Sequence, residues 1–221
     1  VDFTTSSNEI CFGDSATLEL DFNQGGVAPF TVNYSVNAIA QVGGPINNTG
    51  INNISVSPSV GNNTYIINNI TDANGCSNQN NPINAQNIYV NPLPDISITA
   101  LPNPICVGDE AILLFTPLNG TPPYLLDYTE TGNTTLFTAN VPAAGLPVTV
   151  NPDTTTTYNL TYVTDAKNCE SSLSENTILV VNEIPQVNFS SQNEICDGDI
   201  IQLNSLCLCK NPRTICISIN I

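Results

Sequence analysis

The chain has 221 residues, of which 19 are acidic and three are basic, so its formal net charge at neutral pH is −16. Such an acidic surface repels nucleic acid and anionic lipid, and neither is an expected partner. We find no run of about 20 apolar residues that could cross a bilayer, so membrane insertion is not expected. Histidine is absent and only one lysine precedes residue 210. Catalysis would have to depend on carboxylates alone, and we therefore expect no enzyme.

Short motifs recur along the chain in a fixed order, which is typical of tandem domains. A C-x-G-D motif leads into a strand-like run three times, and a T-D-A-x-x-C motif ends an alternating segment twice. The C-x-G-D copies are "NEICFGDSATLEL" (8–20), "NPICVGDEAILLF" (103–115) and "NEICDGDIIQL" (193–203). The T-D-A-x-x-C copies are "TYIINNITDANGC" (64–76) and "TYNLTYVTDAKNC" (157–169). We therefore predict two whole repeats, 1–93 and 94–185, and a partial or divergent third, 186–221.

Each whole repeat is expected to be an all-β domain. Apolar and polar residues alternate over short segments, and turn residues interrupt them about every 8 to 12 positions, which gives about seven strands a repeat. Two strands carry clear predicted core faces: Leu18, Leu20 and Phe22 in the first, and Tyr158, Leu160, Tyr162 and Thr164 in the second. This pattern predicts tandem immunoglobulin-like β-sandwich domains.

Eight cysteines in a histidine-free chain indicate disulfides and an oxidising compartment. The C-x-G-D cysteine and the T-D-A-x-x-C cysteine each occur once in a whole repeat. We therefore expect them to pair inside each repeat, Cys11 with Cys76 and Cys106 with Cys169. By the chain-entropy estimate, each bridge would stabilise its domain by about 4 kcal/mol.

The T-D-A-x-x-C turn carries a second prediction. Gly75 in the first copy corresponds to Asn168 in the second, and these residue types adopt a positive φ most readily, so a left-handed position is expected there. The aspartates Asp72 and Asp165 are expected to accept hydrogen bonds from nearby backbone amides. Calcium bound by turn oxygens is the alternative, and no other cofactor is expected.

Repeated aromatic positions help to decide between a core and a sugar-binding surface. Phe30 corresponds to Tyr124 and Tyr65 to Tyr158, each at the start of a predicted strand. Tryptophan, frequent on flat sugar platforms, is absent. We therefore expect these aromatic rings in the two cores, and a glycan-binding face is the lesser alternative.

The last 18 residues depart from the repeat pattern. They carry both late basic residues and end in a strictly alternating segment. Three interpretations are open: a divergent end of a longer array, a sequence artefact, or a strand donated to a neighbouring subunit. The donor strand would present Ile215, Ile217, Ile219 and Ile221 on one side. Four cysteines with open pairing lie in the third repeat: Cys196, Cys207, Cys209 and Cys216.

The motifs "GDxA", "GGxxPF/PY", "VxPxxxTTY" and "VTDAxxC" together resemble the tandem immunoglobulin-like and PKD-like repeats of large secreted surface adhesins of Bacteroidota, including gliding-motility adhesins. The resemblance covers about residues 1–203, and the lack of a "WDFGDG" stretch favours the immunoglobulin-like branch. It implies export by the type IX route and a role in adhesion or as a stalk. It also implies a glycoprotein with O-linked sugar at Ser15 in "DSA" and Thr154 in "DTT".

We therefore expect a non-enzymatic protein of the cell surface, a disulfide-stapled, semi-rigid stalk or fibre segment joined by proline-containing linkers. Its expected partners are neighbouring repeats or copies of the same protein. The first alternative is a polymerising filament subunit that donates its C-terminal strand, about 214–221, to the next subunit. The lesser alternative is a module that binds surface glycans.

Overall fold

The computed structural model describes residues 2–22, 25–78, 83–133 and 135–184. The expected third repeat, with its four cysteines and the donor strand, lies outside these residues. Every regular element in the described part is a β-strand, and none of it is a helix able to span a membrane. The chain forms two compact units. The first consists of Val1–Pro94, Asn119–Thr121 and Thr164–Ser171, and the second of Asp95–Leu118, Pro122–Val163 and the described residues from Ser172 onward.

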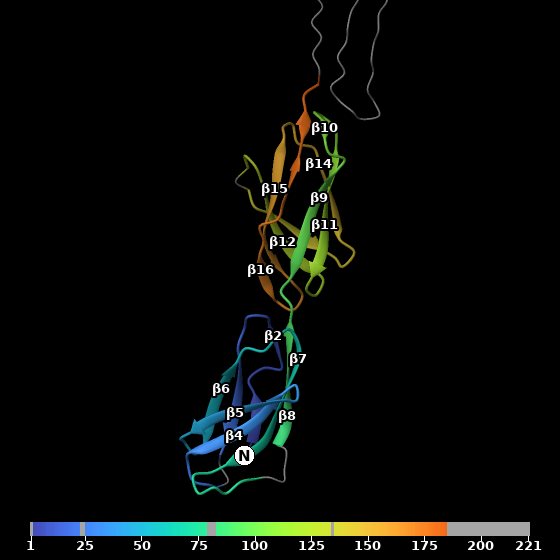
Figure 1. Ribbon diagram of the computed structural model, residues 1–221. Helices are drawn as coiled ribbons and strands as arrows, with labels where there is room; N and C mark the ends of the chain where they lie inside the picture. The colour runs from blue at the N-terminus through green and yellow to red at the C-terminus, as the bar shows by residue number, and fades with distance from the viewer. Residues whose placement is uncertain (1, 23–24, 79–82, 134, 185–221) are drawn as a thin grey trace, which may run out of the picture. The chain divides into compact units, whose positions relative to one another are not determined.

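Eight strands lie within residues 2–91: β1 (Asp2–Thr5), β2 (Glu9–Cys11), β3 (Ala16–Asp21), β4 (Phe30–Val36), β5 (Ile39–Ile46), β6 (Ile51–Val56), β7 (Gly61–Thr71) and β8 (Ile83–Asn91). They form a three-stranded sheet with the order β1-β3-β6 and a five-stranded sheet with the order β2-β8-β7-β4-β5 (Figure 1). All neighbours are antiparallel except β2 and β8, which pair in parallel.

Ten strands follow: β9 (Asp95–Leu101), β10 (Ile105–Cys106), β11 (Ala111–Asn119), β12 (Tyr124–Glu130), β13 (Phe137–Val141), β14 (Leu146–Val150), β15 (Thr156–Thr164), β16 (Glu170–Ser172), β17 (Asn176–Leu179) and β18 (Val181–Asn182). One sheet has the order β14-β11-β9, and a second has the order β13-β12-β15-β16, with β17 also paired to β15. The short strands β10 and β18 pair in parallel.

The two sets of strands repeat one topology, as the predicted tandem repeat requires. In both, the strand that carries C-x-G-D runs parallel to the closing strand, β2 beside β8 and β10 beside β18. In both, a three-stranded sheet faces a larger one. The prediction of an all-β, immunoglobulin-like sandwich is confirmed.

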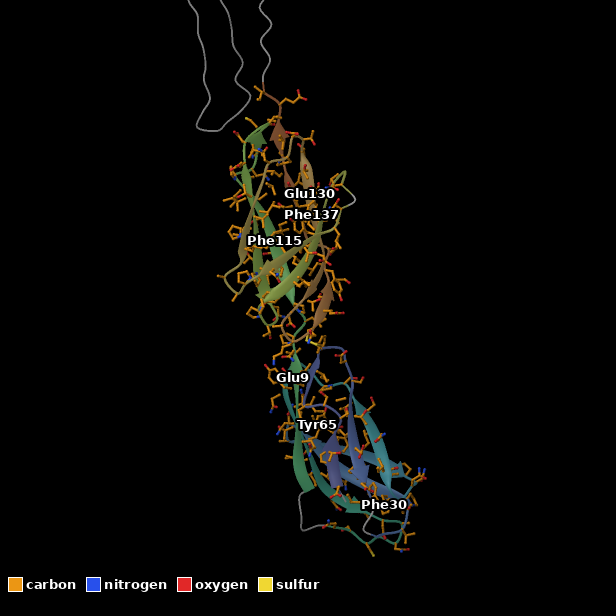
Figure 2. All side chains as sticks on the ribbon, turned by 180° about the vertical axis from the view of Figure 1, so that it is seen from behind. Glu9, Phe30, Tyr65, Phe115, Glu130 and Phe137 are labelled. Atoms are coloured by element: carbon orange, nitrogen blue, oxygen red, sulfur yellow. A yellow bond between two sulfur atoms is a disulfide. The ribbon has the colours of Figure 1, made fainter. Side chains whose placement is uncertain are left out.

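The cores lie between the sheets and contain the repeated aromatic residues. Phe30, Tyr65, Tyr124 and Tyr158 are each at most 3% exposed, which confirms that they serve the cores (Figure 2 labels Phe30 and Tyr65). The predicted core residues Leu18 and Leu20 of β3, and Phe22 just after its end, are also buried. Full burial of a large apolar side chain contributes about 1.5 to 3 kcal/mol, so these positions hold the sheets together.

The predicted core face of β15 is right for Tyr158 and Leu160 and wrong for Tyr162 and Thr164. The last two are only half-buried, whereas Val163 between them is fully buried. Strict alternation therefore breaks after Leu160, and the later side chains change faces.

Strand β7 of the first unit shows the physical reason for this change. Tyr65 and Ile67 are buried, but the next buried residue is Ile70. In the pairing with β4, the register shifts so that Asn68 has no partner, which is a β-bulge. One extra residue moves all later side chains to the opposite face, and β15 has the same burial pattern.

We expect the protein to lose stability in alkali because the phenol of Tyr158 is buried. Burial, with smaller effects of the Glu130 carboxylate and of Tyr128, raises the pKa of Tyr158 to about 12. A phenol in the unfolded chain ionises near pH 10. The contribution of the neutral Tyr158 phenol to the free energy of unfolding is therefore complete below about pH 10 and is lost as the pH rises toward about 12. Thermal denaturation should show a smaller decrease of Tm across this range in Tyr158→Phe than in the wild type. Tyr89→Phe, at an exposed phenol, is the matched control, and equal decreases in all three proteins would contradict the prediction.

Candidate functional site, a turn cross-linked by a disulfide

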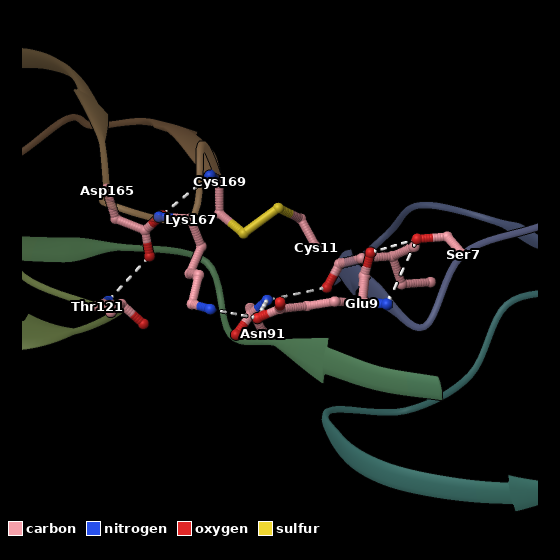
Figure 3. A network of polar contacts seen from close by, with 9 residues as sticks. Ser7, Glu9, Cys11, Asn91, Thr121, Asp165, Lys167 and Cys169 are labelled. Atoms are coloured by element: carbon pink, nitrogen blue, oxygen red, sulfur yellow. Dashed lines mark hydrogen bonds and ion pairs between the residues drawn. A yellow bond between two sulfur atoms is a disulfide. The ribbon is translucent and has the colours of Figure 1, made fainter. Parts of the chain in front are cut away.

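The T-D-A-x-x-C turn of the second repeat is organised by the carboxylate of Asp165. Its Oδ1 accepts the backbone N–H groups of Lys167 at 2.8 Å and Cys169 at 3.0 Å. Its Oδ2 accepts the N–H of Thr121 at 2.8 Å, from a different loop (Figure 3). Asp165 is only 5% exposed, so these three bonds are shielded from water and fix the position of Cys169.

The first repeat builds the same turn around Asp72. Its Oδ1 accepts the N–H groups of Asn74 and Cys76, both at 2.9 Å, and its Oδ2 accepts that of Val27 at 3.2 Å. The bond from Cys76, with those from Val27 and Asn74, holds the pKa of Asp72 below its usual range. The prediction that these aspartates order their turns is confirmed at both positions.

The residue before the cysteine is left-handed in both turns, as predicted. Gly75 has a φ of 78° and Asn168 a φ of 59°. In each turn this residue donates its N–H to the carbonyl of the aspartate three positions earlier, at 3.0 Å. The positive φ is therefore part of the closed turn, and it explains why glycine and asparagine occupy this position.

Alanine at the left-handed position should destabilise the chain by about 1 kcal/mol, because the Cβ then approaches the following carbonyl oxygen. No other group lies within 4 Å of a Cβ built on Gly75, so in Gly75→Ala the cost is conformational alone. We expect similar losses in Gly75→Ala and Asn168→Ala, and close to wild-type stability in Asn168→Gly. Urea denaturation measures all three, and a stable Asn168→Ala variant would contradict this.

The C-x-G-D motif forms a tight turn after β2. Asp14 donates its N–H to the carbonyl of Cys11 at 3.0 Å, and its Oδ2 accepts the N–H of Cys11 at 3.3 Å. Gly13, at the third position, has a φ of 97°. Cys106 and Asp109 make the same two bonds at the same distances. The motif therefore presents its cysteine at the end of a short edge strand.

A disulfide joins these two kinds of turn. Cys11 is bonded to Cys169, with 5.5 Å between their Cα atoms and a sequence separation of 158 (Figure 3). Both cysteines lie in the first unit, which includes the turn Thr164–Ser171. The bond therefore links the start of the first sequence repeat to the end of the second.

The predicted pairing inside each repeat is wrong. Cys11 does not bond Cys76, which is an exposed free cysteine, and Cys106 does not bond Cys169. Cys106 is nevertheless disulfide-bonded. The two T-D-A-x-x-C turns have the same geometry, so either could present a cysteine to Cys11. The turn of the second repeat is the one that lies beside Cys11, and this is why the pairing differs from the prediction.

An ion pair accompanies the disulfide. The Nζ of Lys167 lies 2.8 Å from Oε1 of Glu9, and the amide of the buried Asn91 donates to the same oxygen at 3.0 Å (Figure 3). The bond from Lys167, with that from Asn91, lowers the pKa of Glu9, and the same contact raises the pKa of Lys167. The contribution of Glu9 to the free energy of unfolding is therefore present above the pKa of Glu9 in the unfolded chain, and it is lost as the pH falls through the pKa of Glu9 in the folded chain.

This ion pair is the sequence signal that identifies the right partner. Glu9 stands two residues before Cys11, and Lys167 stands two residues before Cys169. Asn74 stands two residues before Cys76 and carries no charge, whereas Glu194 stands two residues before Cys196 as Glu9 does before Cys11. Lys167 therefore distinguishes the turn that bonds Cys11 from the turn at Cys76, although exposed ion pairs contribute little stability of their own. Sequence reasoning missed this complementarity.

The structure also describes the predicted glycosylation positions and the acidic residues considered for calcium. Ser15 and Thr154, the proposed O-glycosylation positions, are both exposed, and Ser15 contacts Ser57 at 3.1 Å. In the described residues, no group of three cysteine or acidic side chains is arranged to hold a metal ion.

Comparisons with known proteins support the fold. No family model and no curated protein matches the chain. Among solved structures, a marsupial T cell receptor is similar over 92% of this chain and 78% of its own, at 10% identity and a TM-score of 0.52. That likeness is one of fold alone and agrees with the immunoglobulin-like sandwich.

Two bacterial adhesins are similar at lower scores. One is the Ca2+-stabilized adhesin that helps an Antarctic bacterium bind ice, at 14% identity and a TM-score of 0.44, over 84% of this chain and 50% of that chain. The other is the adhesin InvE of Yersinia pseudotuberculosis, at 13% identity and a TM-score of 0.32, over 81% of this chain and 58% of that chain. This chain thus spans about half the length of each.

Proposed function

We propose that the chain is a segment of an extracellular, non-enzymatic adhesive repeat protein whose successive repeats are cross-linked by disulfides. The observation that carries the proposal is the bond from Cys11, at the start of repeat one, to Cys169, at the end of repeat two. A disulfide of this kind persists in an oxidising compartment, which favours a location outside the cytosol. The resemblance to surface adhesins of Bacteroidota supports the adhesive role.

The covalent path explains what such a bond does for a stalk. When the chain is pulled along its length, the force passes directly from Cys11 to Cys169 and bypasses the residues between them. Those 158 positions would extend to roughly 500 Å if unfolded, at 3.3–3.6 Å per residue. The bond therefore prevents the residues between the two cysteines from being drawn out under tension.

Surface chemistry favours the same role. The net charge of −16 keeps neighbouring copies apart and soluble, and the scarcity of lysine and histidine suits a protein without chemistry of its own. Calcium binding, O-linked sugar at Ser15 and Thr154, a donated C-terminal strand and glycan binding are separate proposals. None of them is needed for the mechanical role.

Two measurements test the proposed function. An antibody raised against the chain should label intact cells of its source, whereas labelling only after permeabilisation would contradict a surface location. Single molecules pulled by their two ends should show no unfolding of residues 12–168 while oxidised, and extra extension of roughly 500 Å after reduction. Equal extension before and after reduction would contradict the mechanical role.

A further inference from the structure

Cys76 is a free, exposed cysteine in a turn that is built to hold a bonded one. The second repeat provides an internal comparison, because Cys169 occupies the corresponding position and forms a disulfide with a C-x-G-D cysteine. The same residue types at the same positions therefore already show which partner this turn accepts.

The correspondence extends to individual contacts. In each turn the aspartate accepts the N–H groups of the residues two and four positions later, and that of one residue in a neighbouring loop. In each turn the aspartate N–H donates to the cysteine carbonyl, at 3.0 Å for Cys76 and 2.9 Å for Cys169. The two thiols are therefore presented in the same way by the local backbone.

The two turns differ in what covers them. Cys169 is fully buried and Asp165 is 5% exposed, whereas Cys76 is exposed and Asp72 is half-buried. The cover over Cys169 includes its disulfide partner Cys11, from a C-x-G-D turn. The turn at Cys76 has the same geometry without that partner.

We propose that Cys76 forms a disulfide with the C-x-G-D cysteine of another repeat of this type, either in the same polypeptide or in a second copy. The proposal rests on the proposed function, because it extends the link between repeats to the first repeat's own turn. Asn74 stands where the cross-linked turn has Lys167. The partner therefore needs no glutamate two residues before its cysteine.

The bond forms by thiol–disulfide exchange. The Cys76 thiolate attacks a mixed disulfide between the partner cysteine and a small thiol such as glutathione. The new S–S bond forms as the old one breaks, and the small thiol leaves as a thiolate that takes up the proton released by Cys76. The oxidising equivalent comes from the small-molecule disulfide that made the mixed disulfide.

The full chain carrying Cys169→Ser tests this directly, because it frees Cys11 as a C-x-G-D thiol. In a glutathione redox buffer we expect chains joined from Cys76 of one to Cys11 of the next, seen as concatemers on a non-reducing gel and by peptide mass mapping. Adding Cys76→Ser should abolish these concatemers, and the wild type, whose Cys11 is occupied, should not form them. A Cys76 that stays free, carries glutathione, or bonds a cysteine outside the C-x-G-D motifs would overturn the proposal.

Native protein from its source gives a second test that needs no variant. Peptide mapping without reduction should find Cys76 cross-linked to a C-x-G-D peptide, and the sequence of that peptide tells a neighbouring repeat from a second copy. Free Cys76 beside an intact bond from Cys11 to Cys169 would overturn this inference alone. Free thiols at Cys11 and Cys169 would remove the proposed function as well.

Discussion

Replacing Cys11 and Cys169 together by serine should lower the free energy of unfolding by about 5 kcal/mol. The bond closes a loop with a sequence separation of 158. The chain-entropy estimate for a loop of that size is about 5 kcal/mol, a large share of the margin of about 5 to 15 kcal/mol of a typical domain. Guanidinium denaturation of oxidised proteins measures the loss.

Cys76→Ser is the matched control for this variant, since it changes an exposed free cysteine. Its midpoint of unfolding should equal that of the wild type, and a reducing agent should lower the stability of the wild type more than that of the double variant, which lacks the bond between Cys11 and Cys169. If Cys76→Ser lost as much stability as Cys11→Ser, these two cysteines would be paired with each other. The assigned bond would then be wrong.

Asp165→Ala should lower the free energy of unfolding by about 2 to 4 kcal/mol. The change leaves the N–H groups of Thr121, Lys167 and Cys169 without their acceptor. A buried donor without a partner costs about 1 to 3 kcal/mol, and Asp165 is 5% exposed, so water replaces the carboxylate only in part. Thermal and urea denaturation both measure this effect.

Asp72→Ala removes the same three kinds of bond from the uncovered turn and serves as the control. Water reaches this turn, so the loss should be clearly smaller than in Asp165→Ala. Asp165→Asn should be intermediate, because its Oδ1 can still accept from Lys167 and Cys169 while its amide opposes the N–H of Thr121. Equal losses in Asp72→Ala and Asp165→Ala would show that cover over the turn does not matter.

The fold follows from local signals in the sequence. Alternation and turn spacing predict an all-β sandwich, and internal repetition predicts that it is built twice. The left-handed residue before each T-D-A-x-x-C cysteine is predictable as well, because only a few residue types tolerate it and Gly75 and Asn168 are two of them. Each of these features depends on a few residues that are neighbours in the chain, so it can be predicted from a single sequence.

The face of β15 after Leu160 could not be predicted from alternation. Burial in β15 changes faces after Leu160 as it does beside the bulge of β7. A bulge has no characteristic composition, so alternation alone extends the wrong face through Tyr162. The first repeat holds a clue, because Asn69 stands where Tyr162 does, and a position that accepts both is a poor core position.

The disulfide partner could not be predicted from the motifs either. Cys11 is 65 positions from Cys76 and 158 from Cys169, and both stand at the end of the same kind of turn. Loop entropy grows only with the logarithm of length, so the two choices differ by under about 1 kcal/mol. Contacts between distant segments decide between them, and the sequence sign of that choice is Lys167, which pairs with Glu9 and has no charged counterpart before Cys76.

Peptide mapping of the native, unreduced protein tests the central claim most directly. The account predicts a cross-linked pair of peptides that contain Cys11 and Cys169 and that separate on reduction. Peptides that instead join Cys11 to Cys76 and Cys106 to Cys169 would contradict it, since each repeat would then be stapled only to itself.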